Sequence, residues 1–240
     1  MAVELEDREM TLVEHLEELR TRLITSLVAV TAGTVAAWAW TGEALTWLAR
    51  PVGGLVFLAP TEAFFTRFKL AMFAGFMLAL PVVVYQAWAF TARALGERVR
   101  RHIAFLIPAS YLLFVSGVLL AVFVVVPTAV KFLVAYGTEN VRPLLSAAEY
   151  VSFVGSLAVA FGAVFQLPLA LLLLERLGVI HREALARQRR VVYFLGFVAA
   201  AMMTPGPDVI SQLSLAVPIA LLFELSLLMM RWSEPPDPAF

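Results

Sequence analysis

The chain of 240 residues contains no cysteine, and only 15% of its residues are charged. Without cysteine it can form no disulfide, no thiolate zinc site and no thiol nucleophile. It also lacks the HExxH, GxSxG, P-loop and GxGxxG motifs of common enzyme and nucleotide sites. Its three histidines are far apart in sequence, which indicates no metal site. These absences predict a protein that is not an enzyme and needs no cofactor. Its formal net charge of zero gives no indication of nucleic acid binding.

Apolar residues are abundant instead, at 61% of the chain with a mean hydropathy of +0.86. Soluble domains have roughly 45–50% apolar and roughly 25% charged residues. Four long apolar stretches cover about residues 23–40, 68–90, 103–126 and 150–174. Each reaches the ~18–20 residues that a helix needs to cross ~30 Å of hydrocarbon. None shows the polar face of a soluble core helix, so the sequence predicts an all-α integral membrane protein.

The last part of the chain predicts a shorter pair of spans. Residues 191–203 are apolar, the segment TPGPD interrupts at 204–208, and residues 209–230 are apolar again. At ~1.5 Å per residue, the first of these covers only about 20 Å. We therefore expect six spans, the last two forming a helical hairpin whose short arm is accommodated by bilayer thinning. A re-entrant loop is the alternative.

The positive charges predict the orientation. With six spans, 13 of the 18 Lys and Arg residues fall on the side of the two termini and five on the other. The positive-inside rule then places both termini in the cytoplasm. Charge alone leaves a five-span arrangement open, because the count barely changes. The acidic N-terminus does not resemble a cleavable signal peptide. We expect one membrane domain over residues 1–232 and a Pro-rich cytoplasmic tail at 233–240.

Residues 10–22 predict an amphipathic cytoplasmic helix that runs into the first span. Thr11 and Glu14 have the spacing of a capping box. Leucines recur on one side of this helix, and Glu18 lies on the other. The simplest interpretation of Glu18 is an ion pair with Arg22, four residues on.

Three other polar residues carry open interpretations. Glu97, in a basic loop, has Arg101 four residues on as a possible ion-pair partner. Gln166 lies in the middle of a span, where contact with a partner and packing within the bundle are equally good explanations. Glu224, in the last span, is ionisable and therefore a functional candidate, but a protonated or hydrogen-bonded carboxyl near the cytoplasmic interface is the favoured interpretation.

Several ordered motifs resemble the TatC family. EHLEELRTRL near the start is similar to the family's HLxELRxRL, and residues 60–90 are similar to its second-span region, which ends in YQxWxF. GERVRR, FGAVFQLPLALLLLERLGVI and TPGPDVISQ resemble its E-R motif, its fourth-span region and the turn between its last spans. The similarity covers roughly residues 10–232.

The resemblance implies a receptor subunit of the twin-arginine protein translocase in the bacterial inner membrane, driven by the proton motive force. It implies a six-helix bundle with a concave face and a short final hairpin. Twin-arginine signal peptides of folded proteins would bind at the cytoplasmic surface. The implied peptide-binding residues are Glu18, Glu97, Phe90 and Arg20. A carboxylate suits this task because it can accept the two parallel donors of a guanidinium group.

The resemblance also implies contact with TatA- and TatB-like single-span proteins and with further TatC copies. The implied partner contacts are Gln166, Met202, Pro205 and Asp208. The family commonly has glutamate where this chain has Gln166, and the loop TARALG lacks the proline of the family's A-P-G-L-Y pattern. A small-solute secondary transporter is the alternative function. It would want ionisable residues at mid-depth and often an internal repeat, and the sequence shows no repeat. A membrane-embedded enzyme comes third.

Overall fold

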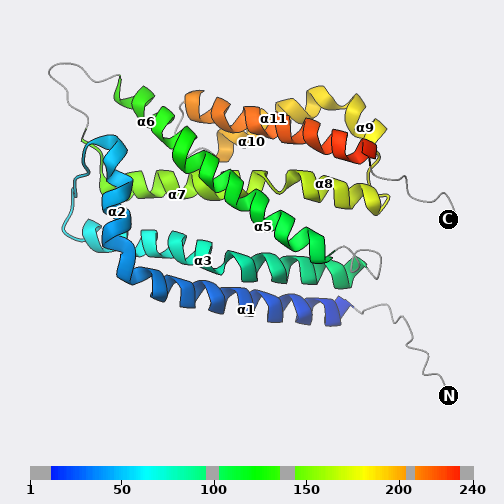
Figure 1. Ribbon diagram of the computed structural model, residues 1–240, viewed down its shortest axis with the longest axis horizontal. Coiled ribbons are helices and arrows are strands. Elements are labelled where there is room, and N and C mark those ends of the chain that lie inside the picture. The colour runs from blue at the N-terminus through cyan, green and yellow to red at the C-terminus, as the bar shows by residue number, and fades with distance from the viewer. Residues whose placement is uncertain (1–11, 96–102, 136–143, 204–208, 233–240) are drawn as a thin grey trace.

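The computed structural model describes residues 12–95, 103–135, 144–203 and 209–232. Within these ranges the regular structure is helical, apart from one isolated β-bridge between Val56 and Ser146. Figure 1 shows the long helices lying side by side along the long axis of the molecule. We call the end where α1 begins the N-terminal end, and the opposite end, which carries α2, the α2 end.

The helices are α1 (Leu12–Ala37), α2 (Thr41–Ala49), α3 (Glu62–Leu95), α5 (Ile103–Leu120), α6 (Val126–Val134), α7 (Ala147–Val164), α8 (Leu167–Arg176), α9 (Arg182–Arg187), α10 (Arg189–Met203) and α11 (Val209–Trp232). Two short 3₁₀ turns, Trp38–Trp40 and Arg50–Val52, flank α2. A π-helical segment, Ala121–Val125, joins α5 to α6. A turn at residues 165–166 separates α7 from α8.

Five helical stretches in the described ranges are long and apolar enough to cross a membrane: Val13–Val52, Glu62–Arg93, Phe105–Phe132, Ala147–Arg176 and Gln212–Arg231. The 15 residues of α10 form a shorter helix that packs against α11. At ~1.5 Å per residue, α10 spans only about 22 Å. The chain is therefore a multi-pass membrane protein whose last two helices form a hairpin with one short arm. The turn between them lies outside the described residues.

Small residues allow α1 and α3 to approach closely. A Cβ atom added at Gly75 of α3 would lie 2.3 Å from the backbone nitrogen of Thr34, and one added at Gly33 would lie 2.5 Å from the carbonyl oxygen of Gly75. In a bilayer the lipid tails are as apolar as the side chains, so helices associate through close packing of this kind. The two glycines therefore fix the register of the α1–α3 pair.

The core of the bundle lies around α7, whose Val151, Leu157 and Phe161 side chains are fully buried. Large apolar side chains on the outer faces of α1, α3 and α10 remain exposed, as expected for surfaces that meet lipid. Buried and exposed sides are thus both apolar, which explains why the spans show so little amphipathicity.

At the α2 end, the carboxylate of Glu62 connects α3 to the start of α7. One oxygen accepts hydrogen bonds from the Ser146 hydroxyl and from the Ala148 N–H, the latter at 3.0 Å. The other oxygen accepts from the backbone N–H groups of Leu58 and Ala59. These bonds join the loop before α3, the first turn of α3 and the N-terminus of α7.

Candidate functional site

A group of polar and aromatic side chains lies between α1 and α3 near the N-terminal end. The rings of His15 and Phe90 stack with centroids 4.5 Å apart and an interplanar angle of 25°. Seven residues along α1, Arg22 donates from Nη1 to Oε1 of Gln86 over 2.8 Å. Glu18 lies between these two contacts, because residues three and four apart share one face of a helix. The antiparallel α1–α3 pair therefore directs Glu18 toward α3.

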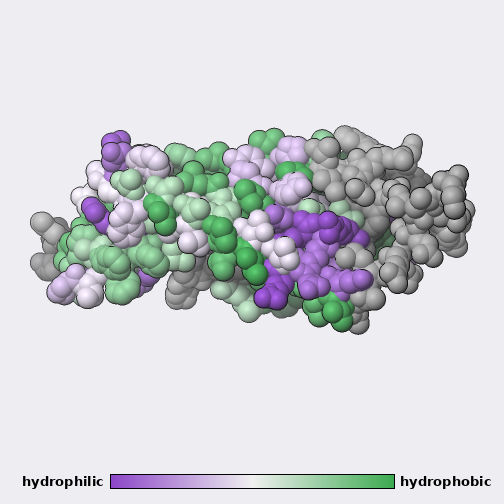
Figure 2. Space-filling view, turned by 90° about the horizontal axis from the view of Figure 1, so that it is seen from below, coloured by the Kyte–Doolittle hydropathy of each residue, from purple (hydrophilic) through white to green (hydrophobic). Residues whose placement is uncertain are grey.

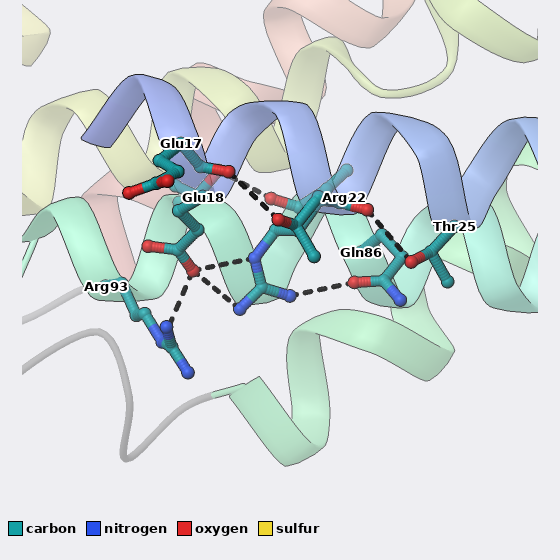
Figure 3. Close-up of polar contacts among 9 residues, drawn as sticks. Glu17, Glu18, Arg22, Thr25, Gln86 and Arg93 are labelled. Atoms are coloured by element: carbon teal, nitrogen blue, oxygen red, sulfur yellow. Dashed lines mark hydrogen bonds and ion pairs between the residues drawn. The ribbon is translucent and has the colours of Figure 1, made fainter. Parts of the chain in front are cut away.

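Glu18 holds two arginine side chains on one oxygen. Its Oε1 accepts a hydrogen bond from Nε of Arg22 at 2.7 Å, and it forms ion pairs with Nη2 of Arg22 at 2.7 Å and with Nε of Arg93 at 3.3 Å (Figure 3). The side chain of Glu18 is only 6% exposed. Its other oxygen, Oε2, is buried and accepts no hydrogen bond from any residue in the part of the chain that the structure describes. Among the described residues, Glu18 is thus a buried carboxylate with two arginines on one oxygen and no donor on the other.

The predicted ion pair between Glu18 and Arg22 is confirmed. It does not account for the whole carboxylate, however. A buried acceptor left without a donor costs roughly 1–3 kcal/mol. Rotation about the last side-chain torsion, which is broad in glutamate, can exchange the two oxygens. The carboxylate can therefore accept a further donor without giving up Arg22.

A groove of ≈ 480 Å³ opens above this carboxylate. It is lined by Glu14, Glu17, Glu18, Thr21, Arg22, Thr25, Gln86 and Arg93. Three carboxylates against two guanidinium groups leave a formal charge of minus one on the lining. Figure 2 looks onto the α1 side of the molecule and shows hydrophilic residues gathered in one patch, while much of the remaining coloured surface is apolar. The groove therefore suits a cationic guest at the edge of an apolar surface.

The structure brings together two of the four predicted peptide-binding residues, Glu18 and Phe90, the latter half-buried against His15. Arg20 is exposed on α1 and does not line the groove. Two residues along a helix correspond to about 200° of rotation, so Arg20 points away from Glu18. Glu97 lies outside the described residues.

Sequence reasoning missed three residues of this group: His15, Gln86 and Arg93. The spacing of Gln86, Phe90 and Arg93 places them on one face of α3. This spacing is the feature of the sequence that could have assigned Gln86 and Arg93 to the site. Their partners on α1 are more than 60 positions away in sequence, so only the packing of the two helices reveals the contacts.

Gln166, which precedes α8, makes both of its side-chain contacts inside the bundle. Its amide nitrogen donates to the carbonyl oxygen of Ser110 over 3.1 Å, and its amide oxygen accepts from the Ser110 hydroxyl. Ser110 itself is 3% exposed on α5. Of the two interpretations open for Gln166, packing within the bundle is the one that the geometry favours.

Met202, at the end of α10, is 83% exposed and therefore free of the bundle core. Pro205 and Asp208, the other predicted partner contacts, lie outside the described residues.

Glu224 accepts a hydrogen bond from the hydroxyl of Tyr193, and it lies 3.0 Å from Nε of Arg189. The interpretation of Glu224 as a hydrogen-bonded carboxyl is confirmed. The contact joins α10 to α11 and strengthens the final hairpin. Among the described residues, no group of three or more His, Asp or Glu side chains could hold a metal ion.

The sequence matches the family described as "Sec-independent protein translocase protein (TatC)" over residues 14–218. The chain belongs to the TatC family. The matched segment contains the whole groove between α1 and α3. The TatC protein of Carboxydothermus hydrogenoformans is 38% identical over 237 residues, which cover 97% of this chain and 98% of that protein. The TatC protein of Aquifex aeolicus is 39% identical over 226 residues, covering 91% and 93%.

Solved structures agree with this family. The structure described as "Crystal Structure of Twin Arginine Translocase Receptor- TatC" superposes with a TM-score of 0.80 at 38% identity, covering 91% of this chain and 99% of that chain. The predicted fold class, an all-α membrane bundle of the TatC type with a short final hairpin, is confirmed. The chain is a TatC component of the twin-arginine translocase, and the comparisons do not favour a small-solute transporter.

Proposed function

We propose that this TatC-family chain is a receptor that captures the arginine pair of twin-arginine signal peptides in the groove between α1 and α3. The observation that carries the proposal is the state of Glu18: a buried carboxylate beneath a groove, with one oxygen that has no donor among the described residues. A guanidinium group of the peptide supplies the missing donor.

Arginine fits this site better than lysine does. Its planar guanidinium presents two parallel N–H donors to the two oxygens of a carboxylate, whereas an ammonium group is a single point charge. Glu14 and Glu17 at the rim of the groove add negative charge for the second arginine of the pair. On the resemblance alone, Glu97 is a further acceptor, and the geometry adds no support for Arg20.

The proposal also covers the location of the receptor in the membrane and its partner proteins. The receptor lies in the bacterial inner membrane with both termini and the groove on the cytoplasmic side, an orientation that the excess of Lys and Arg on that side supports. There the chain acts as a non-enzymatic platform. TatA- and TatB-like single-span proteins dock along the final hairpin, where Met202 is 83% exposed, and further TatC copies complete the complex.

A peptide-binding titration on the purified full-length protein tests the receptor proposal. A signal peptide with its two arginines is compared with the same peptide carrying two lysines, which we expect to bind more weakly. Glu18→Gln keeps the shape of the side chain but removes its charge. Hydrogen bonds to charged groups contribute roughly 1.5–3 kcal/mol, so we expect roughly ten- to hundredfold weaker binding of the arginine peptide.

Glu149→Gln is the matched control. Glu149 is an exposed carboxylate at the start of α7, at the α2 end, far from the groove. Its substitution should leave peptide affinity unchanged. Unchanged affinity in Glu18→Gln as well would show that the groove is not the receptor site.

A further inference from the structure

The two arginines on Glu18 are held in very different ways. Arg22 makes two contacts of 2.7 Å with Oε1, is fixed from the other side by Gln86, and has a side chain only 16% exposed. Arg93 makes one contact of 3.3 Å through Nε, and its side chain is 64% exposed. Arg22 is therefore firmly fixed in the site, whereas Arg93 is weakly held at the entrance of the groove.

We propose that Arg93 is a resident competitor of the signal peptide: it occupies Glu18 when the receptor is empty and must leave before a peptide arginine can bind. The inference rests on the proposed function, because it takes Glu18 as the acceptor for that arginine. It adds a residue of this chain that sets the affinity of the site.

The chemistry of the contact supports competition. Oε1 already accepts a hydrogen bond from Nε of Arg22 and lies within ion-pair distance of Nη2 of Arg22 and Nε of Arg93. A carboxylate oxygen has about two lone-pair directions, so no room is left on Oε1 for a further donor while Arg93 stays. A peptide guanidinium that takes both oxygens of Glu18 therefore needs the place that Arg93 holds. Because Arg93 carries the same group as the guest, it satisfies the same carboxylate in the guest's absence.

The position of Arg93 makes the exchange possible. It lies in the last turn of α3, one turn beyond Phe90, and its side chain reaches the groove from the solvent side. When the Arg93 side chain rotates away from Glu18, its guanidinium becomes fully hydrated and loses only the 3.3 Å contact with Oε1. Ion pairs whose cation stays largely in water contribute little, so Arg93, which is 64% exposed, leaves Glu18 at low cost and returns when the peptide leaves.

The expected size of the effect follows from the occupancy. A guest that binds only the fraction of molecules with an open site shows an apparent Kd raised by the inverse of that fraction. For an exposed ion pair, the occupied form outweighs the open form about one- to fivefold. Arg93→Gln should therefore tighten binding of the twin-arginine peptide by about two- to sixfold.

The test uses the full-length protein and the titration already described, with a second variant to separate competition from general repulsion. Arg190→Gln removes one exposed arginine from the start of α10, away from the groove, and should leave affinity unchanged. In a Glu18→Gln background Arg93 no longer blocks the carboxylate that binds the peptide, so Arg93→Gln should then give no tightening.

The outcomes distinguish the two proposals. Weaker binding in Glu18→Gln, together with tighter binding in Arg93→Gln that disappears in the double variant, supports both. Unchanged affinity in Glu18→Gln overturns the receptor site itself. Weaker binding in Glu18→Gln with unchanged or weaker binding in Arg93→Gln leaves the receptor standing and overturns the competitor. Tightening that persists in the double variant also overturns it, because charge repulsion would then explain the gain.

Discussion

Two glutamates, one at each end of the bundle, differ in the groups that contact their carboxylates. Glu62 at the α2 end receives donors on both oxygens, and all are neutral: one hydroxyl and three backbone N–H groups. Within the part of the chain that the structure describes, Glu18 at the N-terminal end is contacted only by cationic side chains, and all of these contacts are on one oxygen. Among the described residues, both oxygens of Glu62 have donors, whereas one oxygen of Glu18 has none.

The difference lies in what the donors can do. A backbone N–H at the start of a helix cannot move without unfolding that turn, so Glu62 is a permanent connection between α3 and α7. A guanidinium on a long side chain can leave its acceptor at low cost when it is exposed. The donors at the α2 end therefore stay in place, whereas an arginine at the N-terminal end can be exchanged for another cation.

Gly75→Ala should have the largest effect, because it disturbs the N-terminal site through the helix pair that supports it. The new methyl group would lie 2.3 Å from the backbone nitrogen of Thr34, so α1 and α3 must separate. Overpacking of this kind costs about 1–3 kcal/mol. We expect a lower thermal midpoint together with more than tenfold weaker peptide binding.

Gly42→Ala is the control for that change. The nearest atom there is the end of the flexible Arg67 side chain, at 3.3 Å. Stability and binding should both be unaffected. Full peptide affinity in Gly75→Ala would mean that the groove does not depend on the register of α1 and α3.

Glu62→Ala should come next, and it should affect stability alone. It removes the acceptor of four donors at the α2 end, so we expect the thermal midpoint in detergent to fall by several degrees. Peptide affinity of the folded fraction should not change. Glu43→Ala, an exposed glutamate of α2 at the same end, is the matched control. A loss of peptide binding would contradict the separation of the two ends.

Gln86→Ala should have the smallest effect. It removes the hydrogen bond that fixes Arg22 from α3. Such a bond to a charged group contributes roughly 1.5–3 kcal/mol to stability, but Arg22 keeps its contacts with Glu18, so only part of this loss reaches peptide binding. A less ordered Arg22 should weaken peptide binding by about two- to fivefold, as measured in the same titration. Gln188→Ala, at an exposed position after α9, should have no effect. Tighter binding in Gln86→Ala would show that Arg22, and not only Arg93, competes with the peptide.

Local patterns in the sequence predicted local structure well. The apolar stretches gave the spans, and the spacing of Glu18 and Arg22 gave their ion pair, because both depend on neighbours along one helix. The short arm of the final hairpin followed from its length. Continuation of α3 to Leu95 is consistent with the absence of proline from the TARALG segment, since proline would disfavour a helix there.

Contacts between helices could not be predicted in this way. The meeting of Glu18 with Arg93, of Gln166 with Ser110 and of Glu62 with Ser146 depends on how separate helices pack. Nothing in the sequence around either partner of these contacts identifies the other. The sequence also does not indicate that Gly33 and Gly75 set the register of α1 and α3, because their role depends on the contact between the two helices.

The pair formed by Gln166 and Ser110 has a consequence for energy coupling. An elementary charge moved across a membrane exchanges about 2.3 kcal/mol with each 100 mV of potential. The amide and the hydroxyl carry no net charge, and each completes the other between α5 and the α7–α8 turn. The membrane voltage therefore does no net work on this contact. At this point the bundle carries no charge on which the membrane potential could act.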